Sequence, residues 1–166
     1  MKLKSIILIG IIIILASIVI TIIIKVKKKN EKNELPAITF TDIFQGKIHI
    51  LDDNNNQYTL ILFFDPECDL CKDKVILLSE RCNSFINIRL FMISATSKEK
   101  IVSFFKDNNI NICDNIFIIS ALNNLIDNEF KNPTMPSIYL YNKKNVLVKK
   151  FDYIAKIDEI INYTSN

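Results

Sequence analysis

The sequence predicts an α/β domain with a mixed central sheet flanked by helices, preceded by one N-terminal transmembrane helix. Two observations predict the domain: short apolar runs alternate with helical patterns from residue 37 onward, and the chain closes with a hairpin and a helix. A third, the uncharged apolar run 6–24, predicts the transmembrane helix. We therefore expect an anchor at 1–24, a linker at 25–36 and one folded domain at 37–166.

The apolar run from Ile6 to Ile24 contains 19 residues, of which only Ser17 and Thr21 are polar. At about 1.5 Å per residue it would extend roughly 28 Å, close to the thickness of a hydrocarbon core. It is longer than the apolar region of a usual signal peptide, and no small-x-small cleavage site follows it. We expect residues 6–24 to contact lipid and to place the protein in the cytoplasmic membrane as a single-pass protein.

The charges are divided unevenly along the chain. Residues 1–32 hold seven lysines and one acidic residue, a net charge of +6, whereas residues 33–166 hold 14 basic and 17 acidic residues, a net charge of −3. Lysines follow the apolar run in greater number than they precede it, which by the positive-inside rule favours a cytoplasmic domain. The chemistry inferred below favours the extracytoplasmic side, and we expect that orientation. No basic stripe with interleaved aromatic residues is present, so we expect no nucleic-acid partner.

The expected strands are short apolar runs bounded by turn residues, and the last two flank a turn at Asn142–Asn145. They are Ile48–Leu51, Tyr58–Phe64, Ile88–Ser94, Ile116–Ile119, Ser137–Tyr141 and Val146–Phe151. The expected helices have apolar residues at helical spacing, and Ser120 is a plausible cap for the third. They are Cys71–Asn83, Lys98–Asn109, Ser120–Lys131 and Ala155–Tyr163.

Two cysteines separated by two residues follow the most apolar strand. After that strand, Asp65-Pro66 breaks the extended pattern, and Cys68 and Cys71 stand where a helix begins. The free amides and the dipole of a helix N-terminus favour negative charge, so Cys68 is placed to form a thiolate. Cys71, one turn into the helix and more buried, is placed to resolve a mixed disulfide. This pattern predicts a redox-active dithiol.

Two other interpretations of the CxxC are less favoured. Half of a zinc site would need a second pair of ligands, but Cys82 and Cys113 stand alone in the sequence and His49 is the only histidine. Two inert buried thiols are the other alternative, and the strand–CxxC–helix context favours redox chemistry over it. Cys82 and Cys113 are either separate thiols or a disulfide pair, and His49 is more typical of a strand residue than of a ligand.

A second element lies later in the chain, where Thr134, Met135 and Pro136 directly precede a predicted strand. Proline at the start of a strand is often only an edge residue or a break. With the CxxC, however, the order of elements resembles the thioredoxin-like superfamily, of the redoxin type seen in thiol–disulfide oxidoreductases of bacterial cell envelopes. The resemblance covers roughly residues 37–164.

The resemblance implies a thioredoxin-like fold in which Cys68 attacks and Cys71 resolves. It implies a cis peptide at Met135–Pro136, with Thr134, Met135 and Pro136 facing the cysteines and binding an extended substrate segment. It implies no cofactor beyond the Cys68–Cys71 disulfide, protein thiols and disulfides of the cell envelope as partners, and an upstream membrane electron donor.

Several positions depart from the family pattern. Glu67 replaces a frequent tryptophan before the first cysteine, and Leu70 replaces a common proline between the cysteines. Leu62 and Lys74 stand where relatives carry carboxylates, so the proton acceptor for Cys71 is not identified. Asp73 is the nearest candidate, although a solvated helix residue is the simpler interpretation.

Two functions remain open at this stage: exchange of protein disulfides, and a non-catalytic or metal-handling module similar to a copper chaperone. The second is less favoured because no histidine follows His49.

Acidic side chains surround Cys68, at positions 65, 67, 69 and 73. Their repulsion of a thiolate at Cys68, of order 1 kcal/mol, nearly cancels the stabilisation of that thiolate by the helix N-terminus, about 0.5–1 kcal/mol. The balance predicts a reductase rather than an oxidase.

Overall fold

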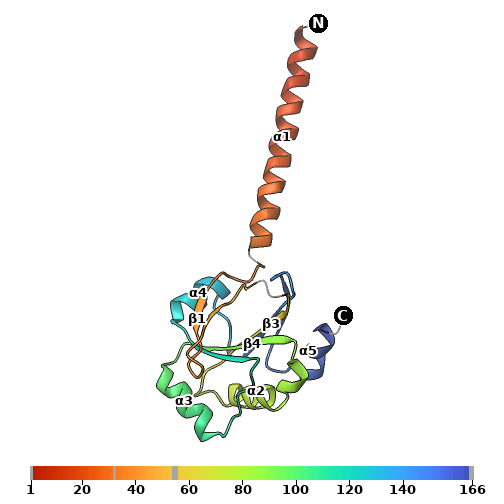
Figure 1. Ribbon diagram of the computed structural model, residues 1–166. Coiled ribbons are helices and arrows are strands. Elements are labelled where there is room, and N and C mark those ends of the chain that lie inside the picture. Colours follow the sequence, from red (N-terminus) through yellow and green to blue (C-terminus); the bar gives the residue numbers. More distant parts are fainter. Residues whose placement is uncertain (1, 32, 54–55, 165–166) are drawn as a thin grey trace. The chain divides into compact units, whose positions relative to one another are not determined.

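The computed structural model describes residues 2–31, 33–53 and 56–164 (Figure 1). The chain separates into two units, Met1–Glu34 and Leu35–Asn166. The first unit is a single helix, α1, over Lys2–Glu31, so the helical conformation continues through much of the expected linker. The second unit contains all the strands and the remaining helices.

The expected location in a membrane is not supported. Among the described residues, no helix has both the length and the apolar character needed to cross a membrane. The expected transmembrane helix is therefore not found, and the expected single-pass location is wrong.

The second unit is built on a five-stranded mixed sheet, as expected. The strand order is β5-β4-β3-β6-β7. Strands β3, β4 and β5 run parallel to one another, β6 is antiparallel to β3, and β7 is antiparallel to β6. Each strand coincides with a predicted apolar run to within a residue. The bounds are β3 Tyr58–Phe63, β4 Ile88–Ser94, β5 Ile116–Ser120, β6 Ser137–Tyr141 and β7 Leu147–Phe151.

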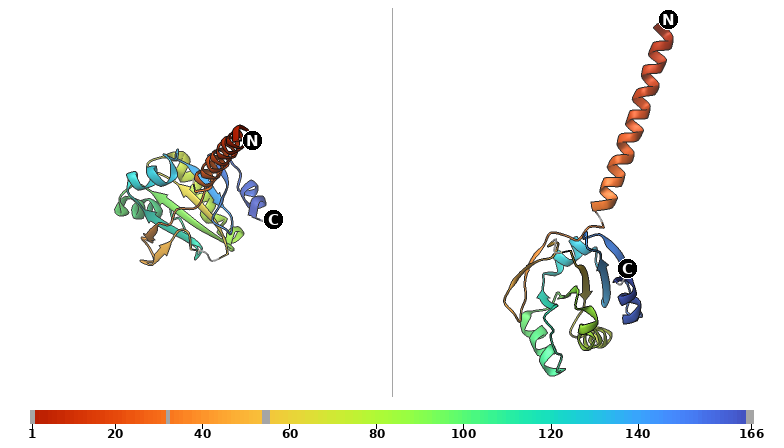
Figure 2. Two further views of the ribbon diagram at one scale, coloured as in Figure 1. Left: turned by 90° about the horizontal axis from the view of Figure 1, so that it is seen from above. Right: turned by 45° about the vertical axis from the view of Figure 1, so that its right-hand side comes forward.

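The two faces of the sheet hold separate apolar clusters, because successive side chains of a strand point to opposite faces. Leu60 and Leu62 pack with α2, α3 and α5, whereas Ile61 and Phe63 pack with α4 (Figure 2). Burial on both faces explains why β3 and β4 are almost continuously apolar. The helices are α2 Asp69–Glu80, α3 Lys98–Asp107, α4 Asn123–Phe130 and α5 Ile157–Thr164.

Two helix boundaries differ from the prediction by three residues. Ser120 does not cap α4, since it continues β5 opposite Ser94 and its hydroxyl donates to the Thr96 carbonyl at 2.7 Å. The helix begins only at Asn123. At the other boundary, α2 ends at Glu80, and Cys82 belongs instead to a short 3₁₀ helix, η1, over Cys82–Phe85. In each case tertiary hydrogen bonding or a local turn overrides the apolar spacing.

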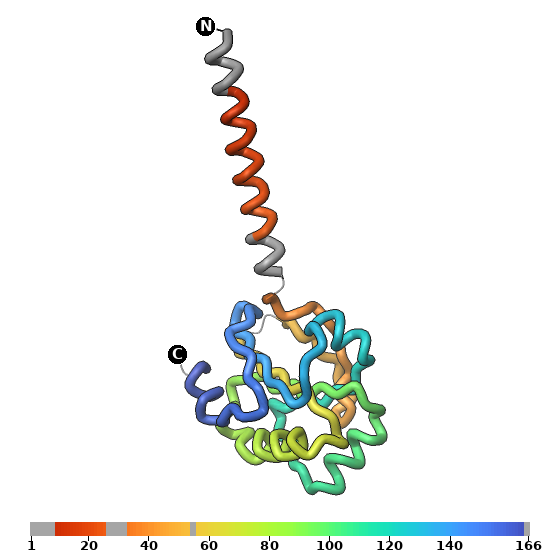
Figure 3. Tube along the Cα trace, turned by 180° about the vertical axis from the view of Figure 1, so that it is seen from behind, coloured from red at the N-terminus to blue at the C-terminus, as the bar shows by residue number. Residues whose placement is uncertain are grey.

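The C-terminal helix α5 lies beside the end of α2 (Figure 3). Arg81, just after α2, donates to the Asp158 carboxylate in α5 at 2.8 Å. Both side chains are largely exposed, so this ion pair adds little to stability. The buried Ile157 and Ile160 of α5 provide the packing against the first apolar cluster.

A small antiparallel hairpin, β1 Thr39–Thr41 with β2 Ile48–Ile50, was not fully predicted, because β1 is very short and partly polar. The buried Asp42 fixes the hairpin to the main sheet. Its carboxylate accepts hydrogen bonds from the backbone N–H groups of Phe44, Gln45 and Ile118, the last at 2.6 Å. A single carboxylate thus holds the hairpin turn and ties it to β5.

The strand register brings three loops to one edge of the sheet. Phe63, the last residue of β3, pairs with Ser137, the first of β6. Ile138 of β6 pairs with Phe151, the last residue of β7. The segment that leads to Cys68, the segment that ends at Pro136 and the loop that follows Phe151 therefore lie at the same edge.

Candidate active site

Cys68 is the N-cap of α2. Its backbone is extended (φ −101°, ψ 116°), and its sulfur accepts a hydrogen bond from the Cys71 backbone N–H at 3.3 Å. The turn before it is set by Asp65, whose Oδ1 accepts from Glu67 N at 2.9 Å and whose carbonyl accepts from Cys68 N at 3.1 Å. The sulfur thus takes the place of a capping side-chain oxygen, with one backbone N–H directed at it.

Cys71 lies one turn deeper in α2. Its side chain is fully buried, on the same helix face as Val75 and Leu78, whereas Cys68 is half-exposed. Burial raises the pKa of the Cys71 thiol from an ordinary 9.0 to about 12, and its side-chain hydrogen bond with Cys68 adds to the rise. Both thiols are free in this structure. The pair is therefore asymmetric, with an accessible sulfur at the helix end and a protonated one behind it.

A cation from another helix enters the acidic surroundings of Cys68. Lys100 of α3 binds Glu67 with Nζ and Oε1 2.6 Å apart, and both side chains are exposed. The pKa of Glu67 is lowered by this hydrogen bond and by the charge of Lys100. Asp65 also attracts Lys100. One ammonium thus offsets part of the acidic cluster that the sequence placed around Cys68.

The predicted substrate loop reaches the same edge of the sheet. The Met135–Pro136 peptide is cis, as the resemblance implied. Pro136 is buried and Thr134 is exposed, while the half-buried Met135 packs against the apolar cluster that Cys68 also contacts. The structure thus brings all five predicted site residues to one edge.

A third segment, the loop after β7, is tied to α2 by Lys74. The Lys74 side chain is buried, and its Nζ donates to the Ala155 carbonyl at 2.9 Å. Burial lowers the pKa of this ammonium, and the nearby Asp152 partly opposes the change. Lys74 therefore holds this loop against α2. Asp73 is exposed, as a solvated helix residue would be.

Exposed apolar side chains lie on both the motif and this loop. Leu70, between the two cysteines, is 51% exposed, and Ile154 is 69% exposed. Because Lys74 anchors the loop to α2 one turn beyond Cys71, both side chains belong to the edge that carries the dithiol. Apolar surface next to a reactive sulfur is typical of a site that receives another macromolecule.

The other two cysteines form a disulfide between Cys82 and Cys113, which resolves the alternative left open by the sequence. The bond joins η1 to the segment before β5. As a disulfide, this pair has no thiolates to offer a metal ion. Within the described part of the chain, no cluster of three or more histidine, cysteine or acidic residues is arranged to bind a metal.

This chain is similar to known proteins in its fold but not in its sequence. No protein-family model matches this chain, and no curated protein matches its sequence. Solved structures do match. The thioredoxin domain of a thiol–disulfide oxidoreductase from Bacteroides vulgatus is 19% identical, with a TM-score of 0.64, over 81% of this chain and 94% of that one.

A secreted disulfide oxidoreductase of Mycobacterium tuberculosis, homologous to E. coli DsbE, is 16% identical with a TM-score of 0.63, over 78% of this chain and 95% of that one. The chain has a thioredoxin-like fold. A peroxiredoxin-like protein from Aquifex aeolicus is also similar, at 10% identity and a TM-score of 0.64, over 80% and 84% of the two chains. At these identities the similarity establishes the fold and not the reaction.

Two contributors to the site were missed by sequence reasoning. Lys100 and Lys74 look like ordinary surface lysines in the sequence, and no local pattern distinguishes them. Their partners, Glu67 and the Ala155 carbonyl, lie 33 and 81 residues away along the chain. Only the three-dimensional arrangement of α2, α3 and the loop after β7 reveals them.

Proposed function

We propose that this chain is a thiol–disulfide oxidoreductase that exchanges disulfides with partner proteins through Cys68 and Cys71. The observation that carries the proposal is the position of the Cys68 sulfur, which caps α2 and accepts the Cys71 N–H, with Cys71 fully buried behind it. This arrangement supplies an accessible nucleophile and a second thiol within reach.

The exchange has two steps. The Cys68 thiolate attacks one sulfur of a partner disulfide, and the partner's other sulfur leaves as a thiolate. The sulfur of Cys71 then attacks Cys68 in this mixed disulfide and gives its proton to the departing partner sulfur. The partner gains two electrons, and the chain is left with a Cys68–Cys71 disulfide. A dithiol electron donor must reduce that disulfide before the next cycle.

The high pKa of Cys71 fits this order of events. Burial is the largest cause of this rise, and the hydrogen bond with Cys68 and the charge of Cys68 add to it. Once Cys68 is bonded to a partner sulfur, it carries no thiolate charge, so both contributions of Cys68 fall. Cys71 therefore becomes more acidic at the stage at which it must act as a nucleophile.

The partner is proposed to be a protein that presents an extended segment to Thr134, Met135 and Pro136. This loop lies at the same sheet edge as Cys68, and exposed Leu70 and Ile154 supply apolar contacts there. Protein disulfides persist in oxidising compartments, and the Cys82–Cys113 disulfide is a bond of that kind. We therefore propose that the chain works where disulfides are stable.

The direction of electron flow is proposed to be reduction of the partner. Asp65 and Asp69 repel a thiolate at Cys68, and Lys100 offsets only part of the acidic charge, since it is already bound to Glu67. A thiolate that is not strongly stabilised makes the dithiol a better reductant.

The test is reduction of insulin disulfides by the purified chain, with dithiothreitol as the electron donor. We expect the wild type to accelerate precipitation of the insulin B chain and Cys68→Ser to be inactive. The matched control is Cys82→Ser/Cys113→Ser, which removes the other cysteine pair and should retain activity. Equal activity in wild type and Cys68→Ser would refute the proposal, and stoichiometric copper or zinc in the purified protein would favour the metal-handling alternative.

A further inference from the structure

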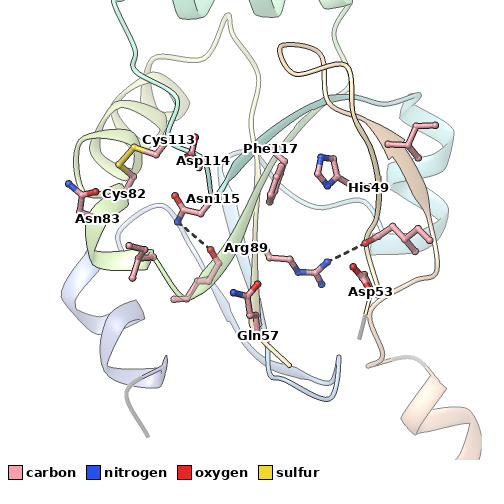
Figure 4. Close-up of a pocket in the computed structure, with 14 residues that line it drawn as sticks. His49, Asp53, Gln57, Cys82, Asn83, Arg89, Cys113, Asp114, Asn115 and Phe117 are labelled. Atoms are coloured by element: carbon pink, nitrogen blue, oxygen red, sulfur yellow. Dashed lines mark hydrogen bonds between the residues drawn. A yellow bond between two sulfur atoms is a disulfide. The ribbon is translucent and has the colours of Figure 1, made fainter. Parts of the chain in front are cut away.

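A cavity of about 810 Å³ lies at the end of the sheet opposite to Cys68 and Cys71, and Figure 4 shows the residues that line it. It is lined by β2, by the first residues of β4 and β5, and by the Cys82–Cys113 disulfide. The dithiol follows the carboxyl end of β3, whereas Arg89 is the second residue of β4 and pairs with Thr59 near the start of β3. The cavity is therefore separate from the proposed active site, and its volume is typical of a pocket for a small molecule.

The most unusual side chain in the lining is Arg89, which is only 7% exposed. Its guanidinium donates to three neutral acceptors: the carbonyls of Ile50 (3.3 Å) and Leu51 (2.8 Å) and the Thr59 hydroxyl (2.9 Å). Its Nε–H has no hydrogen-bond partner. Buried arginines are usually paired with a carboxylate, and within the described residues none lies within ion-pair distance of Arg89.

His49 adds a second unpartnered group. Its Nε2 is buried without a hydrogen-bond partner, and its ring packs on Phe117 with centroids 4.3 Å apart. Phe91 connects the two groups, since its ring lies 6.4 Å from that of His49 and 5.5 Å below the Arg89 guanidinium. A cation and an imidazole thus border an aromatic surface (Figure 4).

The mouth of the cavity limits what can enter. Ile48 and Ile86, which line the cavity, are each 70% exposed, so part of its rim is apolar. Asp53 and Asp114, both exposed, also line the cavity, and Asp53 and Asp52 attract Arg89 from a distance. These carboxylates would repel a group with two negative charges more strongly than a group with one.

We propose that this cavity binds a small carboxylic acid with an aromatic or apolar body. Its single carboxylate accepts hydrogen bonds from Arg89 and His49, and its body packs on Phe117 and the isoleucine rim. Arginine suits this task because its planar guanidinium matches a carboxylate.

The test is an NMR titration of the full chain with benzoate, with benzamide as a neutral probe of the same shape and phenyl phosphate as a dianion. We expect benzoate to shift the Arg89 Nε–H and Phe117 amide signals saturably, with an affinity at least about tenfold above that of benzamide. His49→Phe, which keeps the ring contact, and Arg89→Gln should each reduce that preference. Lys100→Gln, at the other end of the sheet, should leave it unchanged.

Three results would overturn the proposal. They are equal binding of benzoate and benzamide to the wild type, tighter binding of phenyl phosphate than of benzoate, and shifts confined to residues outside the cavity. Because these comparisons use the wild-type chain, they decide the question even if Arg89→Gln, which loses bonds to Leu51 and Thr59, does not fold.

Discussion

At the scale of single residues, the two sulfur atoms differ because their surroundings differ. Cys68 stands at the end of a helix, half-exposed, with a backbone N–H directed at its sulfur. Cys71 is surrounded by the apolar core, which disfavours its charged form. Neither environment is a property of the residue type. Each follows from the point at which α2 begins.

The first prediction concerns the pH dependence of Cys71. In Cys68→Ser, where the remaining active-site thiol is Cys71, alkylation should be very slow near pH 8 and should keep rising as the pH approaches 12. Burial, the largest cause of the raised Cys71 pKa, remains in this variant, although the contributions of the Cys68 hydrogen bond and charge are lost, so the pKa should stay above the ordinary 9.0. The pH dependence is measured from the rate of iodoacetamide labelling, which mass spectrometry follows. A plateau near pH 9–10 would show that Cys71 is an ordinary accessible thiol.

The second prediction concerns the ion pair beside Cys68. Lys100→Glu replaces the cation bound to Glu67 with a fifth nearby acidic group, so alkylation of Cys68 at neutral pH and low salt should slow by about two- to fivefold. Lys98→Gln, on the same helix, is the matched control and should have little effect. Added salt should reduce the difference. A rate that does not respond to Lys100→Glu would mean that the pair does not influence the sulfur.

At the scale of elements, the molecule depends on a few polar side chains that join segments distant in sequence. Lys74 ties α2 to the loop after β7, and Asp42 ties the β1–β2 hairpin to β5. The apolar runs of the sequence predict strands and helices well, because burial on one or both faces leaves a periodic pattern. They do not predict these hydrogen bonds between distant segments, since no local sequence pattern marks a lysine or an aspartate as buried.

The third prediction concerns Asp42. Asp42→Ala leaves three backbone N–H groups without their acceptor, including the buried one of Ile118, and should lower the free energy of unfolding by about 1–3 kcal/mol. Asp42→Asn keeps one acceptor oxygen and should cost less. Urea denaturation of the three proteins measures the difference. Stability equal to wild type in Asp42→Ala would show that water replaces the carboxylate without cost.

At the scale of the whole molecule, the sequence anticipates the thioredoxin-like fold because every main strand is an apolar run and the CxxC marks the start of α2. The edge that carries the site follows from strand order. The short strand β1, the start of α4 at Asn123 and the Cys82–Cys113 bond were beyond prediction, because they depend on contacts across the sheet or between loops. The expected membrane location came from the apolar run alone, and no described helix meets the requirements of a span.

The fourth prediction concerns the disulfide that joins η1 to the segment before β5. Its cysteines are 31 residues apart, and a loop of that length corresponds to about 3–4 kcal/mol of stabilisation through the unfolded state. Cys82→Ser/Cys113→Ser should therefore unfold at lower urea concentration. The change should match that produced in the wild type by reduction of this bond alone. No change in the unfolding midpoint would show that the bond restrains nothing.

The central claim, that Cys68 attacks and Cys71 resolves, is tested most directly by trapping the mixed disulfide. Cys71→Ser, incubated with a disulfide-containing protein and resolved on a non-reducing gel, should accumulate a covalent adduct that dithiothreitol releases. Mass spectrometry should place the bond at Cys68. Cys68→Ser should form no adduct. An adduct through Cys71 in Cys68→Ser, or no adduct with either variant under conditions where the wild type reduces insulin, would contradict the account.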